Sequence, residues 1–147
     1  MKSFYTILGA IGLLAQQAHA NTITPPLSWD DANTWCITND HGTLYAPAPG
    51  RSYVSYTETI NYTMQKMTHM AYMSCGNDRN CWVGARRRSP HEKLWVNVDF
   101  TSPHLPWAPS QPDNFNGAEA CAYFYAGTQG GLNDFRCGEK NVGVCSN

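Results

Sequence analysis

Residues 111–121 read QPDNFNGAEAC and combine side-chain amides, two carboxylates and a proline near the end of the 147-residue chain. The segment has neither the periodicity of a helix nor that of a strand. A solvated surface turn would account for its polarity. However, a second polar pair, Asn133 and Asp134, lies between Cys121 and Cys137. A disulfide joining those two cysteines would bring the pair close to the first segment, so both segments are candidates for one shared site.

The two segments together offer only hard oxygen ligands, three of them carboxylates: Gln111, Asp113, Glu119, Asn133 and Asp134. Calcium binds about six to eight such oxygens at roughly 2.3–2.6 Å and tolerates irregular geometry. Magnesium demands a near-ideal octahedron, and softer metals prefer nitrogen or sulfur. Without a cation, three neighbouring carboxylates would repel one another. An acidic surface loop does not explain why both segments carry ligands, so the sequence predicts a single calcium (Ca2+) site.

The N-terminus has the order of a secretory signal peptide: Lys2, an apolar run, and small residues at Ala18 and Ala20. The apolar run is shorter than the roughly 20 residues that a membrane-spanning helix needs. No later segment is apolar enough to span a membrane. The sequence therefore predicts a signal peptide over residues 1–20 and one secreted domain over residues 21–147, without membrane insertion.

Charge is close to balanced, with 10 Lys and Arg against 11 Asp and Glu. This balance gives no reason to expect attraction to nucleic acid or to anionic membranes. The run Arg86-Arg87-Arg88 is a local exception. Three consecutive arginines are typical of a solvated loop tip, and a sulfated or phosphorylated ligand is the lesser alternative.

Six cysteines in a secreted chain predict disulfides, although about 15 pairings are possible and counting does not choose among them. Zinc is disfavoured because the chain has no CxxC pair and its histidines are scattered. No nucleophile, base and orienting group can be assembled from the sequence, which argues against an enzyme.

Two helices are predicted in the first half of the chain. The first begins at Ser28, with Asp31 completing a capping box and Gly42 as its stop. Its core face carries Trp29, Ala32 and Cys36 at spacings of three and four. The second helix begins at Ser55, and its apolar stripe is Ile60, Met64, Met67 and Ala71. Asn61 starts the single N-glycosylation sequon and lies beside that stripe.

Strands are predicted in the second half. Residues 81–85 form a short apolar run, and residues 94–100 place Leu94, Val96, Val98 and Phe100 on one face. Short closing strands follow at 121–126, 131–137 and 141–145. Between them lies a long loop of residues 101–118, a length that is usually functional or disordered. Helices followed by strands predict an α+β domain.

Five motifs occur in order along this domain: SWDDANTWC with GTLYAP, CWVG, QPDN with Glu119 before Cys121, NDFRC, and the closing GVC. In this order they resemble the C-type lectin-like domain family over essentially all of residues 21–147. The resemblance implies two helices packed on small antiparallel sheets, a long calcium-binding loop and disulfide staples. It pairs Cys36 with Cys145 and Cys121 with Cys137, which leaves Cys75 for Cys81. It also implies a cis Gln111–Pro112 bond when calcium is bound.

The resemblance further implies a lectin, in which two vicinal sugar hydroxyls complete the calcium shell and also bond the ligating side chains. An ionised carboxylate only accepts hydrogen bonds, whereas an amide whose oxygen is on the metal still donates. The QPD order resembles readers of terminal galactose or N-acetylgalactosamine. The sugar-binding residues implied are Gln111, Asp113, Phe115, Glu119 and Asn133. Phe115 either covers the C–H face of galactose or packs beneath the loop.

The chain departs from the family pattern in three ways. Leu132 stands where the family usually has tryptophan, which removes packing but no ligand oxygen. The stretch after QPD is shorter than in galactose-type relatives, and Ala120 argues against a second calcium. The alternative function is a protein-binding or ice-binding module in which calcium is structural or absent. No coiled coil or collagen repeat is present, so any oligomer would need another form of assembly.

Overall fold

The computed structural model describes residues 22–47, 75, 80–103, 105–125 and 131–146. The elements are α1 (Trp29–Thr38), β1 (Thr43–Leu44), β2 (Cys81–Arg86), β3 (Val96–Asn97), the 3-10 turn η2 (Phe115–Gly117), β4 (Cys121–Phe124), β5 (Leu132–Phe135), β6 (Val142–Gly143) and β7 (Cys145–Ser146). This arrangement confirms the α+β class. The predicted signal peptide, second helix and Asn61 sequon lie outside the described residues.

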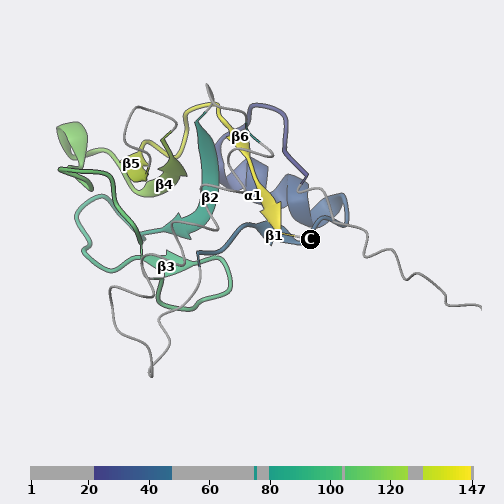
Figure 1. The fold of residues 1–147 in the computed structure, drawn as a ribbon, viewed down its shortest axis with the longest axis horizontal. Helices are drawn as coiled ribbons and strands as arrows, with labels where there is room; N and C mark the ends of the chain where they lie inside the picture. The colour runs from purple at the N-terminus through teal and green to yellow at the C-terminus, as the bar shows by residue number, and fades with distance from the viewer. Residues whose placement is uncertain (1–21, 48–74, 76–79, 104, 126–130, 147) are drawn as a thin grey trace, which may run out of the picture.

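Strand β2 organises the larger sheet, whose order is β3-β2-β4-β5 (Figure 1). These neighbours are antiparallel, whereas β6 pairs with β2 in parallel. A separate antiparallel pair joins β1 to β7. In Figure 1, α1 lies on one side of β2 and the strands β4 and β5 lie on the other. In Figure 1, η2 is the green coiled segment on the side of β4 and β5 away from α1, and in the sequence it lies between the candidate ligands Asp113 and Glu119.

Helix α1 starts as the sequence predicts. Ser28 is the N-cap: its Oγ accepts a hydrogen bond from Asp31 N at 3.3 Å and donates to Asp31 Oδ2 at 2.6 Å. The predicted core face, Trp29, Ala32 and Cys36, is buried. The predicted stop at Gly42 is wrong, because the helix ends at Thr38 and Asn39 is its C-cap. Asn39 satisfies the helix end through its own side chain, which donates to Trp35 O at 2.9 Å.

The main core lies between α1 and the sheet. Trp82 of β2 is fully buried, and the rings of Tyr123 and Phe135 surround it at 5.9 and 6.2 Å between centroids. Its indole Nε1 donates to Leu27 O at 2.9 Å, and the indole of Trp29 donates to Val83 O at 2.8 Å. Both buried indole N–H groups therefore have partners, as burial requires.

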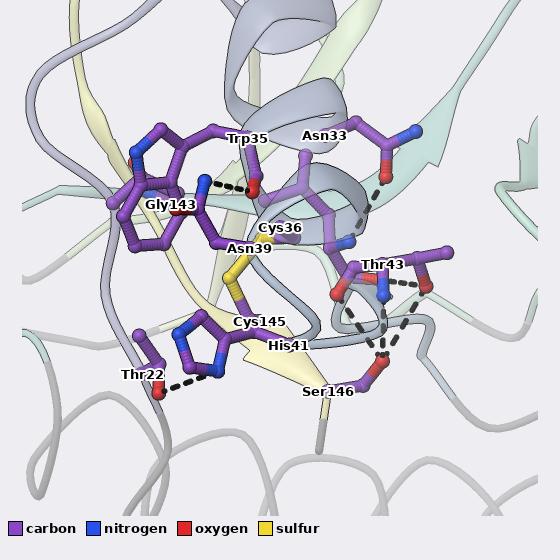
Figure 2. Close-up of a disulfide and its surroundings, with 12 residues drawn as sticks. Thr22, Asn33, Trp35, Cys36, Asn39, His41, Thr43, Gly143, Cys145 and Ser146 are labelled. Atoms are coloured by element: carbon purple, nitrogen blue, oxygen red, sulfur yellow. Dashed lines mark hydrogen bonds between the residues drawn. A yellow bond between two sulfur atoms is a disulfide. The ribbon is translucent and has the colours of Figure 1, made fainter.

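Three disulfides tie these parts together: two have the pairings that the family resemblance implies, and the third joins the two cysteines that those pairings leave over. Cys36–Cys145 joins α1 to β7 across 109 residues, and Cys121–Cys137 closes the β4–β5 unit across 16. Cys75–Cys81 forms the third bridge. Figure 2 shows the first bridge beside the stacked rings of Trp35 and His41. In the chain-entropy model, closing loops of about 100 and 15 residues stabilises the fold by about 4.7 and 3 kcal/mol.

The predicted alternation over residues 94–100 is wrong. Leu94 and Phe100 are 64% and 90% exposed, whereas Asn97 is buried, and only Val96–Asn97 forms strand β3. The side chain of Asn97 donates to Pro47 O at 2.7 Å and to Thr101 Oγ1 at 2.9 Å, so a polar anchor replaces the expected apolar face. Phe100 has a φ of 65°, which turns the chain and ends the alternation.

Gly84, in the CWVG motif, lies where β2 passes close to other backbone, and its N–H donates to Tyr45 O at 2.7 Å. A Cβ there would stand 2.6 Å from Leu44 O and 2.9 Å from Val98 Cγ2. We expect Gly84→Ala to lower the free energy of unfolding by about 1–3 kcal/mol in a urea titration, because the core would be overpacked. Gly138→Ala is the matched control, since a Cβ there meets nothing within 4 Å. Equal effects of the two changes would contradict the close approach.

Candidate metal centre

Three carboxylates converge at one end of the β4–β5 unit. One oxygen each from Asp113, Glu119 and Asp134 lies within 4.8 Å of the others. Asp113 belongs to the long loop, Glu119 precedes β4, and Asp134 lies in β5 opposite Ala122 of β4. The antiparallel pairing of β4 and β5 thus brings the second polar segment to the first. All three carboxylates of the predicted ligand set are gathered here.

The carboxylate of Asp134 is fully buried and has a donor for each oxygen. Oδ1 accepts from Asp113 N at 3.0 Å, and Oδ2 accepts from Asn114 N at 3.0 Å. The guanidinium of Arg87 also donates to Oδ2, at 2.8 Å. Two backbone amides of the loop and one arginine therefore compensate the buried charge.

Arg87 is a site residue that the sequence reasoning missed. It was predicted to lie in a solvated loop tip, but its exposed fraction is 7%. The backbone continues beside β4 after the end of β2, since Arg87 N donates to Ala120 O at 2.8 Å. The side chain is thereby directed toward Glu119 and Asp134. One signal in the sequence could have indicated this role. The three arginines directly follow the predicted strand 81–85, and the same sequence predicts a cluster of three carboxylates that a cation would stabilise.

Glu119 is also buried, with 5% of its surface exposed. Its Oε2 accepts from Phe115 N at 2.9 Å, and its backbone N–H donates to Asn114 Oδ1 at 3.1 Å. Burial raises the pKa of this carboxyl above its ordinary value, and the negative charges of Asp134 and Asp113 raise it further. The hydrogen bond from Phe115 N opposes this rise in pKa. The site therefore disfavours a third negative charge when no cation neutralises it.

The loop itself is shaped by local polar contacts. Gln111 Oε1 accepts from Asp113 N at 3.2 Å, and the Gln111–Pro112 bond is cis. Asn114 has a φ of 49°, in the left-handed region that asparagine tolerates better than most residues. The ring of Phe115 is 61% exposed. Phe115 is therefore largely exposed to solvent, and its backbone N–H contacts Glu119.

Asn133 carries an acceptor without a partner. Its Nδ2 donates to Tyr123 Oη at 3.1 Å, but its buried Oδ1 has no hydrogen bond. Among the described side chains it is one of two buried oxygens without a partner, the other being Asn97 Oδ1, and such an atom calls for an explanation. Asn133 Oδ1 belongs to the residue before Asp134, and a hard cation is one partner that would satisfy it. The donor set of carboxylate and amide oxygens, without nitrogen or sulfur, fits calcium.

The family model described as the lectin C-type domain matches residues 25–147. The chain therefore belongs to this family, whose members are generally binding modules rather than enzymes. No curated protein matches the chain in sequence. Among the described residues, none of the helices has the length and apolar character to cross a membrane.

Solved structures agree on the fold. A calcium-dependent type II antifreeze protein in its calcium-free form superposes with a TM-score of 0.62 at 20% identity, covering 85% of this chain and 88% of its own. The carbohydrate-recognition domain of the mouse scavenger receptor C-type lectin gives 0.57 at 23%, covering 86% and 87%. The C-type lectin CEL-I from Cucumaria echinata gives 0.55 at 22%, covering 84% and 83%. Both sugar-binding lectins and an antifreeze protein thus share this architecture.

The raised pKa of Glu119 predicts that its ionised carboxylate destabilises the fold in calcium-free solution, and this can be tested. A carboxyl whose pKa is higher in the folded state contributes stability below its unfolded pKa, and this contribution is lost as pH rises through the folded value. We expect Glu119→Gln to melt at a higher temperature than the unmutated protein above that folded pKa. The difference should vanish as pH falls below the ordinary value of 4.5.

The exposed Glu139 supplies the matched control, Glu139→Gln. Melting curves in excess chelator between pH 3.5 and 8, a range spanning roughly the ordinary carboxyl values, would measure both variants. A Glu119→Gln protein that is less stable at every pH would show that the carboxylate is held by favourable contacts rather than strained by its neighbours.

Proposed function

We propose that this protein is a secreted, calcium-dependent lectin that recognises terminal galactose or N-acetylgalactosamine. The observation that carries this proposal is the convergence of Asp113, Glu119 and Asp134 within 4.8 Å, at a loop that also exposes Phe115. A cluster of three carboxylates repels itself unless a cation joins it. The QPD order at residues 111–113 supports a galactose-type reader.

In this proposal the three carboxylates hold the ion, and the side-chain oxygens of Gln111 and Asn133 complete the protein's ligand set. When bound, calcium would offer its remaining coordination positions to two vicinal sugar hydroxyls. The carboxylates accept hydrogen bonds from those hydroxyls. The amides of Gln111 and Asn133 each keep an N–H2 group that donates to a hydroxyl oxygen. The order of amide and carboxylate thus sets which hydroxyl pair fits.

Phe115 supports the choice of galactose. Its ring is 61% exposed and sits two residues beyond Asp113. An exposed aromatic ring beside the hydroxyl-binding groups suits a sugar that has an apolar C–H face. Burying that face removes apolar surface from water and stabilises the complex.

The alternative is a module that binds protein or ice, with calcium structural or absent. One observation favours it: Arg87 already forms an ion pair with Asp134 at 2.8 Å, so part of the site's charge is compensated without a metal. The likeness to an antifreeze protein is compatible with this alternative. Binding to galactose-agarose with elution by a calcium chelator distinguishes the two functions, because only the lectin would be retained and then released.

Calcium should stabilise the protein, and the exposed Asp113 permits a clean test. At a calcium concentration of about 100 times Kd, binding adds about 2.7 kcal/mol, which raises Tm by several degrees. We expect Asp113→Ala to lose most of this rise in calorimetry and to lose retention on galactose-agarose. Asp40→Asn, at another exposed aspartate with a φ of 59°, should keep both. An unmutated protein whose Tm ignores calcium would show that the ligand assignment is wrong.

Sugar choice should follow the order of amide and carboxylate. The double change Gln111→Glu and Asp113→Asn keeps the charge and the number of ligand oxygens, so calcium-induced stabilisation should persist. It reverses the pattern offered to the hydroxyls, and preference should move from galactose toward mannose. Competition assays with both free sugars measure this preference. If galactose remains preferred, the loop's shape rather than its donor order sets selectivity.

Phe115→Ala is the companion variant in the same assay. It should cost galactose binding about 1 kcal/mol if the ring covers roughly 40 Å² of sugar at 25 cal/mol per Å². When Phe115→Ala is added to the double variant Gln111→Glu and Asp113→Asn, mannose binding should barely change, because the proposal gives the ring no contact with mannose. Equal losses for both sugars would show that Phe115 supports the loop rather than the galactose face.

A further inference from the structure

Arg87 connects three parts of the chain that meet at the carboxylate cluster. Its Nε and Nη2 both donate to Glu119 O, at 3.0 and 2.7 Å. Nη2 also donates to Asp134 Oδ2 at 2.8 Å, and Nη1 donates to Glu92 O at 3.3 Å. The ring of Trp95 lies 5.0 Å from the guanidinium carbon and covers it. The planar guanidinium, which has five N–H donors, thus binds three residues at its edge and packs against an aromatic ring on its face.

The loop hydrogen bonds end on the same acceptors. Asp113 N and Asn114 N donate to the carboxylate of Asp134, and Phe115 N donates to Glu119 Oε2. Arg87 contacts both acceptor residues, through the Asp134 carboxylate and the Glu119 carbonyl. Breaking a buried ion pair by removing one partner is strongly destabilising, so the contact with Arg87 holds the Asp134 side chain in place inside the fold. The loop amides then keep this acceptor even when no metal is bound.

Charge counting agrees with this role. When ionised, the three carboxylates carry three negative charges and Arg87 carries one positive charge, which leaves two negative charges at the site. One divalent cation would neutralise them.

We propose that Arg87 is a built-in cation that holds residues 113–119 in their closed conformation without calcium. In this conformation the loop amides are hydrogen-bonded to the carboxylates of Asp134 and Glu119. Calcium then joins a pre-formed site and does not fold the loop. The part of this inference that concerns calcium rests on the proposed function. The positioning role of Arg87 rests only on its contacts with Asp134 and Glu119. A loop that stays closed without metal would also keep its binding surface when calcium is scarce.

Amide hydrogen exchange measured by NMR tests the proposal, because the N–H groups of Asp113 and Asn114 report directly on their bonds to Asp134. In the unmutated protein we expect protection of these amides in excess chelator to lie within about tenfold of that in calcium. Arg87→Met keeps the apolar stem and removes the charge. Its protection in chelator should fall by about 100-fold or more, and saturating calcium should restore most of it. Arg136→Met, at an exposed arginine after β5, is the matched control and should show no change.

Arg87→Lys keeps the charge but loses the fork, and it serves if the methionine variant does not fold. A lysine should hold either Glu119 O or Asp134, so intermediate protection in chelator is expected. Unprotected Asp113 and Asn114 amides in the chelated, unmutated protein would overturn the proposal. So would an Arg87→Met protein whose amides remain fully protected in chelator, or an Arg87→Lys protein that is as poorly protected as Arg87→Met. A protein that shows the predicted exchange pattern but ignores calcium and galactose would refute the proposed function and leave the role of Arg87 standing.

Discussion

The buried carboxylate of Asp134 is the constraint on which the site depends. Removing an ionised carboxylate from water costs several kcal/mol unless charge and hydrogen bonds compensate it. Here two loop amides and the guanidinium of Arg87 compensate it, all at 2.8–3.0 Å. Each partner belongs to a different segment from Asp134 itself. Satisfying one carboxylate therefore fixes the end of β2, the long loop and β5 relative to one another.

The hydrophobic core positions the strands that bury Asp134, although the direct partners of its carboxylate are polar groups. Trp82 and the rings around it anchor β2 and β4, and the Cys121–Cys137 bridge closes the β4–β5 unit. These elements form a rigid base, whereas the loop above them is held mainly by hydrogen bonds to Asp134 and Glu119. Polar contacts of this kind lose strength when a partner changes charge. A metal ion or a nearby cation can therefore act on this loop through its acceptors, Asp134 and Glu119.

Solved structures of this fold include both lectins and an antifreeze protein. Among the described residues, neither Asp113 nor Phe115 belongs to a hydrophobic core cluster, and both are exposed. Their identities can therefore change without changing the core. This separation is the general pattern in which binding residues lie on loops supported by a rigid scaffold.

Much of the fold was predictable because its signals are local. The capping box at Ser28 and the core face of α1 depend on residues within one helix, and residue types alone identified the carboxylates of the candidate site. Tertiary structure decided the rest. Asn97 is buried and Phe100 is exposed because the partner of Asn97 is Pro47, which is distant in sequence. Arg87 belongs to the site because it donates a hydrogen bond to Asp134, which lies 47 residues away in the sequence. No local sequence pattern encodes a contact between residues so far apart.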